Sequence, residues 1–559
     1  MADIGLLPAF LQSWCTRNSI VFQSRNTAHY HLQSNSLCCS YATKISRVNY
    51  GFGFWRTQSL VTPSLTKPGT RSFAKNRNRK VLVFQCSQLE SKNYHIIVLG
   101  GGVAAGYAAF SYVSMGGESN QLAILSDEPV PPYERPSLSK GFMDPDIRME
   151  PSEFYTCAAV AQFPQDEKWY EEHGVDLYLN TRAQQVDISS KKIICENGYI
   201  FYYEKLIIAT GSRARRYSPS QVPFSNLDGI LYLRSIEDAN VVRNWIDELK
   251  GQGKAVVIGG GFLAMEIASA LVVNNIHVTM AYPGDYLLNK LFPAQVAKQY
   301  EQVFRDKGVE MLNNCFVENF YERNDGFASA VRFQDGRKVF GDFFIVCIGA
   351  VPNIELFQGQ LQLQNGGIEV NHRLQCVGHS DIYAVGDIAS FPLKAYSNRP
   401  VRIEHVDHSR KSAASAILDI FHGNPYGNTK HRDDPRLSVF RAAIDTTYNY
   451  IPFYYSRMFE LCWNFYGDNS GTTFVWGNVP SKMVTLWIDW SNKIVGILLE
   501  GCSPFEHRVA HQIAVHRPKV DTSELQRIAQ VSQVFEHLLN LLPEKMEKIR
   551  TIQEENVNK

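Results

Sequence analysis

The sequence predicts an α/β protein with two parallel-sheet domains, because one pattern of residues occurs twice in the chain. Each copy consists of an apolar strand, a glycine-rich turn, an Ala-rich helix and a second apolar strand. The two glycine turns begin at Gly100 and Gly259, 159 residues apart. A buried parallel strand that leads through closely spaced glycines into a helix is typical of a dinucleotide-binding βαβ unit. The repeat therefore predicts two Rossmann-like domains, each with a nucleotide site.

The first 88 residues are expected to lie outside this fold. Between Asp3 and Glu90 the chain has eleven Lys and Arg residues and no acidic residue, and no long apolar run follows the basic start. This composition is typical of an organellar transit peptide rather than a secretory signal. The many hydroxyl side chains favour the chloroplast, with the mitochondrion as the alternative. A basic tail that binds nucleic acid is the other interpretation.

The first βαβ unit has an apolar strand at 95–99 and a second at 122–125. Gly100 permits the tight turn, and Gly102 allows the backbone to approach a pyrophosphate. The helix that follows presents free N–H groups and a partial positive charge to the phosphates. Glu128, just after the second strand, is placed to accept the hydroxyls of an adenosine ribose. The residues expected at this site are Gly100, Gly101, Gly102, Val103, Ala104 and Glu128.

A proline-rich loop at 129–140 follows the first unit and is expected to be extended and stiff. Its Arg135 and Lys140 could neutralise a pyrophosphate or the polar edge of a flavin. A solvated loop cation is the alternative for each. A later apolar strand at 205–208 ends in Ala-Thr-Gly, which is typical of a chain that crosses between two dinucleotide-binding domains.

The second βαβ unit has strands at 254–258 and 278–282 around the turn at Gly259. In proteins with two such units, the first usually binds FAD and the second a nicotinamide nucleotide. Gly284 stands where an acidic residue would be expected after the second strand. A carboxylate there binds the ribose of NAD and repels the phosphate of NADP, so its absence bears on the choice of cofactor.

The chain then returns to the first domain. An apolar strand at 343–348 precedes Gly349, and a further strand at 381–385 ends in Gly386 and Asp387. At this distance after the first unit, Asp387 is expected to contact the ribitol of FAD or its phosphate. The segment 402–411 holds two His and two acidic residues, but it lacks the spacing of a metal site, and we expect no metal.

The composition restricts the other possibilities. Lys and Arg number 56 against 55 Asp and Glu, which gives no reason to expect a nucleic-acid partner. The sequence contains no run of eighteen apolar residues, so no membrane span is predicted. The eleven cysteines are scattered without a Cys-x-x-Cys pair, which indicates buried thiols in a reducing compartment. The aromatic segment 448–463 is expected to form strands, and the tail from Ser523 a helix. The oligomeric state stays open.

Four segments together resemble the plant monodehydroascorbate reductases: residues 101–109, 132–140, 404–408 and 465–469. The resemblance runs from about residue 94 to about residue 520. It implies an enzyme in which NADH or NADPH reduces FAD, and the flavin then passes single electrons to two monodehydroascorbate radicals. The absence of a Cys-x4-Cys pair fits direct transfer from flavin to substrate.

The resemblance also implies roles for individual residues. FAD would be held by Gly101 to Ala104, Glu128, Arg135, Lys140, Arg234, Asp387 and Val406. The nicotinamide side would comprise Gly260, Gly261, Glu266, Lys290, Gly349, Glu404 and His405. Arg410 and Tyr455 occupy the positions that contact the substrate, where a guanidinium suits an anionic enediol and a phenol can hydrogen-bond its ring.

The departures from the family are concentrated in the second unit. Ala264 replaces a glycine, Gly284 the ribose-binding Glu and Lys290 an Arg, and an insertion of roughly fifteen residues lies around 427–444. Two hypotheses follow. The first is a chloroplast FAD enzyme that reduces monodehydroascorbate, with NADPH relatively favoured as the electron donor. The second is a flavin-binding protein that has lost NAD(P)H turnover and acts as a redox sensor or assembly partner.

The expected organisation combines two Rossmann-like domains with a C-terminal α+β interface domain. Its parts are a leader (1–88), the FAD-binding domain (94–215 and 346–402), the NAD(P)-binding domain (216–345), the C-terminal domain (403–520) and a helical tail (521–559).

Overall fold

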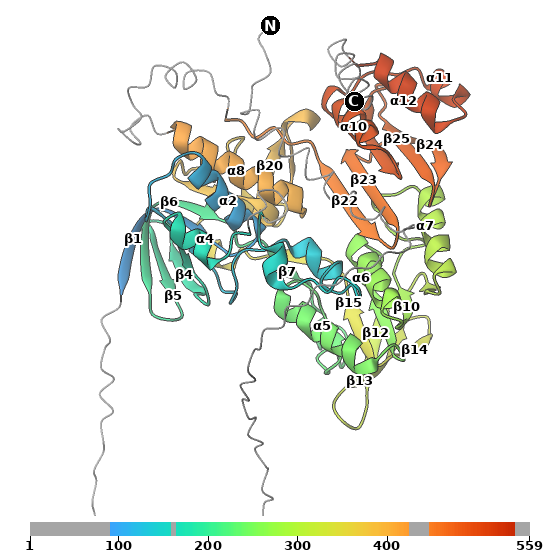
Figure 1. Cartoon of the computed structure of the whole chain (residues 1–559), viewed down its shortest axis with the longest axis horizontal. Coiled ribbons are helices and arrows are strands. Elements are labelled where there is room, and N and C mark those ends of the chain that lie inside the picture. The colour runs from blue at the N-terminus through green and yellow to red at the C-terminus, as the bar shows by residue number, and fades with distance from the viewer. Residues whose placement is uncertain (1–89, 158–163, 424–445, 543–559) are drawn as a thin grey trace, which may run out of the picture. The chain divides into compact units, whose positions relative to one another are not determined.

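The computed structural model describes residues 90–157, 164–423 and 446–542 (Figure 1). The predicted transit peptide and the insertion around 427–444 lie outside these residues. Within them, the predicted class is confirmed, because the structure contains a largely parallel sheet, a second sheet that is wholly parallel, and a C-terminal antiparallel sheet.

The first sheet has seven strands in the order β3-β2-β1-β6-β5-β4, with β19 paired to β6. Its parallel strands are β1 (Ser91–Leu99), β2 (Leu122–Leu125), β3 (Val175–Tyr178), β6 (Ile200–Ile208) and β19 (Ile382–Ala384). β4 (Ala183–Asp187) and β5 (Lys192–Cys195) run antiparallel at one edge. Helices α2 (Val103–Ser114) and α8 (Val406–Gly423) pack against each other, as Figure 1 shows.

The register of this sheet brings three chain turns together. Leu99 and Ala384 both pair with Ile208, at the carboxyl ends of β1, β19 and β6. The glycine turn, the Ala-Thr-Gly crossing and the Gly386–Asp387 turn therefore begin side by side. Ligands of open α/β sheets bind at this edge, which makes it the place to look for a cofactor.

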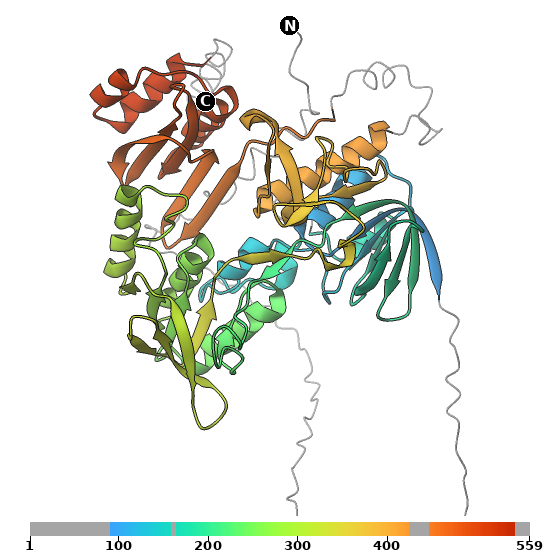
Figure 2. The same cartoon turned by 180° about the vertical axis from the view of Figure 1, so that it is seen from behind.

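The second sheet has five parallel strands in the order β11-β10-β9-β15-β8. They are β8 (Ile230–Leu231), β9 (Lys254–Ile258), β10 (His277–Ala281), β11 (Glu310–Leu312) and β15 (Phe343–Val346), accompanied by helices α5 (Ile236–Leu249), α6 (Phe262–Val273) and α7 (Ala294–Asp306). A separate antiparallel sheet of β12 (Val317–Glu322), β13 (Ala328–Phe333) and β14 (Lys338–Phe340) lies against β9 and β15 (Figure 2). The chain passes between the two domains twice. The two crossing segments, β7 (Ser212–Ala214) and β16 (Ala350–Pro352), pair as a short antiparallel ribbon.

The glycine turns of the two units have the same construction. Gly100 has φ +119°, and a Cβ atom there would lie 2.4 Å from the carbonyl oxygen of Ala209. Gly259 has φ +140°, and its Cβ atom would lie 2.3 Å from the carbonyl oxygen of Cys347. Both positions therefore require glycine, for backbone conformation and for space.

The third glycine position is also shared by the two units. Ala105 and Ala264 both stand five residues after the first glycine of their turn, and both are fully buried. A methyl group is thus accommodated at the helix–strand contact of both units. Ala264 therefore has the same structural role as Ala105, although the resemblance treated it as a departure.

The C-terminal sheet is antiparallel, in the order β22-β23-β26-β25-β24. Its strands are β22 (Phe453–Met458), β23 (Leu461–Gly467), β24 (Thr472–Asn478), β25 (Lys482–Ile488) and β26 (Ile494–Glu500), covered by α10 (Pro504–His516). The expected strands in the aromatic segment are present as β22 and β23. The predicted single tail helix is wrong, because the structure contains α11 (Thr522–Arg527) and α12 (Val531–Asn540) instead. The Ile528 carbonyl between them accepts a hydrogen bond from Trp476 Nε1 (3.0 Å), which fixes a non-helical turn.

The tail offers a direct test of this packing. Leu538 of α12 is fully buried in the cluster formed with α10 and β25. We expect Leu538→Ala to lower the free energy of unfolding by about 2–5 kcal/mol, because it leaves a cavity in a packed core. The measurement is the midpoint of urea unfolding followed by fluorescence. Ser532→Ala, on the exposed side of α12, is the control, and equal midpoints for the two variants would contradict the packing.

Candidate functional site

The first glycine turn opens onto a cradle for phosphate groups. Gly102 is the N-cap residue of α2, and the first turn of that helix contains no acidic residue. A Cβ atom at Gly102 would have the Arg135 guanidinium as its nearest neighbour, 3.8 Å away. Free backbone N–H groups beside a guanidinium are suited to a pyrophosphate, so this turn fits the diphosphate of FAD.

Glu128 and Arg135 meet beside this turn. The Arg135 guanidinium binds one oxygen of the Glu128 carboxylate, and the Tyr133 hydroxyl donates to the other at 2.6 Å. Arg135 Nη1 also donates to Tyr133 Oη (2.8 Å) and to the carbonyl oxygen of Arg234 (2.9 Å). The side chain of Arg135 is only 20% exposed. It is therefore a fixed part of the site, and the alternative of a solvated loop cation is wrong for this residue.

Asp387 is the second anchor of the expected FAD site. The Ser212 hydroxyl (2.6 Å) and Arg234 Nη2 (2.9 Å) both donate to its Oδ2 atom. Burial opposes the charge of this carboxylate, but Arg234 and Ser212 outweigh it and hold the pKa of Asp387 below its usual value. Arg234 Nε is buried and has no hydrogen-bond partner among the described residues, which leaves a donor for a ligand.

The start of α8 carries two buried histidines. Burial lowers the pKa of His405 and of His408 to about 4, so both rings are neutral at physiological pH. His408 is fully buried, stacks on Phe391 and shares a 2.8 Å hydrogen bond with Tyr448. In the described part of the chain no group of three or more His, Cys, Asp or Glu side chains could hold a metal ion.

Glu266 of α6 joins three parts of the chain. Its buried carboxylate forms an ion pair with Lys140 (2.6 Å) and accepts hydrogen bonds from the hydroxyls of Ser139 and Ser456 (2.5 Å each). Lys140 was expected on the FAD side and Glu266 on the nicotinamide side. The structure brings the two together, with Ser456 contributed by β22. Lys140, like Arg135, is therefore not a solvated cation.

Arg410 and Tyr455 lie in the same region. Arg410 Nη2 pairs with Glu134 Oε2 (2.7 Å), and the Tyr107 hydroxyl donates to Glu134 Oε1 (3.0 Å). Burial raises the pKa of Tyr455 to about 12, against the opposing effect of Arg410, with Glu134 and Glu266 also acting on it. Tyr455 therefore keeps its proton at physiological pH. Arg410 Nε is buried without a partner in the described residues, so this cluster retains a donor for an anion.

The residues of this site that were not identified from the sequence include Glu134, Ser139 and Ser456. Glu134 and Ser139 lie in the 132–140 segment that carries the resemblance, so their chain position was a usable signal. Ser456 lies in an aromatic strand, and no local pattern marks it.

The second glycine turn lies at a cleft of about 550 Å³. Of the residues expected on the nicotinamide side, Gly260, Gly261, Lys290 and Gly349 line it. Gly261 is the N-cap of α6, and a Cβ atom there would meet nothing within 4 Å, which leaves the helix N-terminus open to a phosphate. Glu404 is outside the lining and pairs with Arg402, which is part of it, and His405 follows in the chain.

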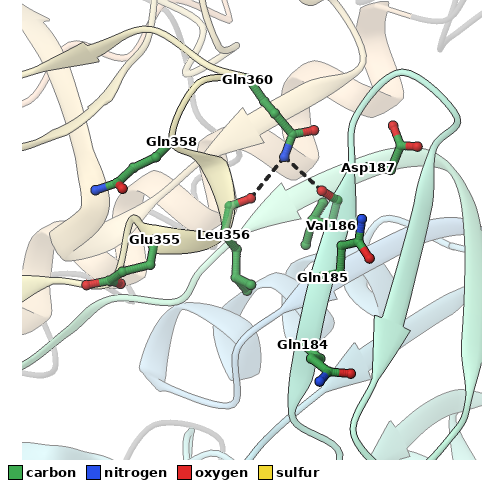
Figure 3. Close-up of a pocket in the computed structure, with 8 residues that line it drawn as sticks. All are labelled: Gln184, Gln185, Val186, Asp187, Glu355, Leu356, Gln358 and Gln360. Carbon is green, nitrogen blue, oxygen red and sulfur yellow. Dashed lines mark hydrogen bonds between the residues drawn. The ribbon is translucent and has the colours of Figure 1, made fainter.

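A second pocket, of about 310 Å³, lies between β4 and the turn at 355–360 (Figure 3). The Gln360 amide donates to the carbonyl oxygens of Val186 (2.8 Å) and Leu356 (3.1 Å) across it. These hydrogen bonds therefore join two segments of the chain. None of the residues assigned above to the two nucleotide sites lines this pocket.

Comparisons with known proteins show which families the chain is similar to. The family model described as pyridine nucleotide-disulphide oxidoreductase matches residues 94–413, and the one described as monodehydroascorbate reductase 3-like, C-terminal domain, matches residues 451–532. Monodehydroascorbate reductase 3 of Arabidopsis thaliana is 37% identical over 441 residues, which cover 78% of this chain and 96% of the relative. The peroxisomal monodehydroascorbate reductase 4 of the same plant is 37% identical over 435 residues, covering 77% and 84%.

Among solved structures, the covalent putidaredoxin reductase–putidaredoxin complex has a chain that matches with a TM-score of 0.67 and 23% identity, over 80% of this chain and 98% of that chain. At this identity the match shows the fold. No helix in the described residues is both long and apolar enough to cross a membrane.

The buried histidines predict how stability depends on pH. An unfolded histidine has a pKa of about 6.5, whereas that of folded His408 is about 4. The unfolded chain therefore binds more protons between these values, and stability falls as the pH is lowered from 7 towards 4, by up to about 3 kcal/mol for one such group.

We expect His408→Phe to reduce the drop in melting temperature between pH 7 and pH 5, measured by differential scanning fluorimetry. His516→Phe, at an exposed position of α10, is the control and should keep the wild-type drop. An unchanged drop in the His408→Phe variant would contradict this prediction, because it would mean that folding does not lower the pKa of His408.

Proposed function

The chain belongs to the monodehydroascorbate reductase family, and we propose that it is an FAD enzyme that reduces the monodehydroascorbate radical with NADH or NADPH. The observation that carries this proposal is the cluster of Arg410, Glu134 and Tyr455 beside the Lys140–Glu266 pair. It supplies a guanidinium and a protonated phenol between residues of both nucleotide-binding domains.

The residues of the first unit fit FAD. The α2 N-terminus and Arg135 would hold the diphosphate, Glu128 the adenosine ribose, and Asp387 with Arg234 the ribitol side. The chemistry that bound FAD supplies is acceptance of a hydride and release of single electrons. The alternative, a flavin-binding protein without turnover, is not favoured, because the second glycine turn is intact and its helix N-terminus is open.

Arg410 and Tyr455 have complementary tasks towards an anionic enediol. The guanidinium orients the anion through its unpaired Nε donor. The Tyr455 hydroxyl, with its pKa of about 12, is a hydrogen-bond donor at physiological pH and can supply a proton to the substrate oxygen as negative charge builds up there. Glu134 holds the guanidinium in place through a 2.7 Å ion pair.

Steady-state kinetics of the full chain with bound FAD test this function. We expect Arg410→Ala to raise the KM for enzymatically generated monodehydroascorbate by about 10–100-fold, the scale of a lost charge-assisted hydrogen bond of about 1.5–3 kcal/mol. Reduction of ferricyanide by the same variant should change little. Arg182→Ala, which removes an exposed cation, is the control. A wild-type flavin that NAD(P)H reduces, but that monodehydroascorbate does not reoxidise, would contradict the proposal.

We further propose that residues 1–88 direct the protein to the chloroplast. The acid-free basic composition of this segment supports an organellar address, and relatives with peroxisomal names show that location varies in the family. A fusion of residues 1–88 to a fluorescent protein should accumulate in chloroplasts of leaf cells. Accumulation in mitochondria would favour the alternative address, and a cytosolic or peroxisomal signal would contradict both.

A further inference from the structure

The cleft of the second unit has no carboxylate at the end of β10. From residue 282 to residue 291, the side chains that line the cleft include one charged group, the ammonium of Lys290. In a βαβ unit this edge is where the 2′ position of the adenosine ribose lies when the diphosphate sits on the helix N-terminus. The side chains here therefore decide between a free 2′-hydroxyl and a 2′-phosphate.

The acidic residues near this edge are engaged elsewhere. Asp285 is exposed, accepts a hydrogen bond from the Asn314 side chain (3.2 Å) and does not line the cleft. Glu301 is buried and accepts from the Tyr282 hydroxyl and from the backbone N–H of Leu287, both at 2.9 Å. Neither carboxylate is placed to grip a ribose or to repel a phosphate.

The loop is packed around the glycine at 284. A Cβ atom there would lie 2.3 Å from Asn289 Nδ2, so the Asn289 amide occupies the space that a ribose-binding side chain would need. The loop is tied down at two points. The backbone N–H of Leu288 donates to the Gly260 carbonyl (2.8 Å), and the Asn469 side chain donates to the Lys290 carbonyl (2.6 Å).

Lys290 is the cation whose charge is not compensated. The two arginines that also line the cleft are paired, Arg399 with Asp468 (3.3 Å) and Arg402 with Glu404. Within the described ranges, Lys290 has no ion-pair partner, and its side chain is exposed. An amide donor and a free ammonium at this edge form a site for a dianionic phosphate.

We propose that this cleft selects NADPH over NADH, with Lys290 and Asn289 binding the 2′-phosphate and with Gly284 bringing no carboxylate to repel it. The inference rests on the proposed function for the use of a nicotinamide nucleotide, and it deepens that function by naming the donor. Electrostatic binding of a phosphate by an exposed lysine also makes the preference dependent on salt.

Equilibrium binding separates this inference from catalysis. NADP+ and NAD+ are titrated into the full-chain FAD protein by calorimetry at low and moderate salt. We expect NADP+ to bind at least 10-fold more tightly than NAD+. Lys290→Gln should weaken NADP+ binding about 10-fold and leave NAD+ binding within 2-fold, whereas Lys290→Arg should keep the preference. Lys298→Gln, an exposed position of α7 outside the cleft, should behave as the wild type.

A reciprocal variant tests the glycine. Gly284→Glu should lower NADP+ affinity and raise NAD+ affinity, because the exposed Asn289 side chain can rotate away to admit the new carboxylate. Gly284→Gln adds the same bulk without the charge and should lower NADP+ affinity less, without a gain for NAD+. Equal effects of the two variants would overturn the charge argument.

Other outcomes of these titrations also decide whether the inference and the proposed function hold. A wild-type protein that binds NAD+ as tightly as NADP+, or a Lys290→Gln variant that keeps the NADP+ preference, overturns the inference. Preferential NADP+ binding without reduction of monodehydroascorbate would leave the inference in place and contradict the proposed function. Binding of neither nucleotide would overturn both.

Discussion

The buried carboxylate of Glu266 is the contact on which the rest of the site depends. Glu266 lies on α6 of the second unit, and the side chains that bind its carboxylate come from the loop after β2 and from the C-terminal sheet. A carboxylate that is 4% exposed is stable only while its charge is matched. Removal of one member of such a pair costs about 3–5 kcal/mol. The position of the nicotinamide domain against the FAD domain is therefore coupled to one ion pair and two hydroxyl groups.

The local parts of this architecture could be predicted from the sequence. Glycine turns, apolar strands and the residues after them are set by neighbours in the chain, so both βαβ units were found with their turns in place. Ser456 was missed, because its partner is 190 residues away and no periodicity reports such a pairing. The partner of Glu134 is 276 residues away, so only the position of Glu134 in the 132–140 segment could have marked it. The break in the tail helix has the same origin, since Trp476 reaches the Ile528 carbonyl from a distant strand.

The second βαβ unit keeps the backbone of the first at its glycine turn but differs from it in the residues after the second strand. Their glycine turns have matching backbone conformations, and Ala105 and Ala264 are equally buried, so the scaffold of the second unit is intact. The acidic residue after the second strand is one difference between the two units. The first unit retains Glu128, clasped by Arg135 and Tyr133, whereas the second has Gly284, Asn289 and Lys290. This replacement fits the NADPH preference proposed above, because the glycine turn that holds the diphosphate is kept.

The charges at the proposed substrate cluster would let it bind an anion and release it again. Arg410 is matched by Glu134 and Lys140 by Glu266, so the four groups carry no net charge. A substrate anion in the proposed site would therefore be oriented by the remaining Arg410 Nε donor and the Tyr455 hydroxyl rather than attracted by a bare pair of cations. The product carries a similar negative charge and must leave for turnover. A site whose cations are already paired binds both species modestly, and the contacts that remain are directional ones that align the substrate for electron transfer.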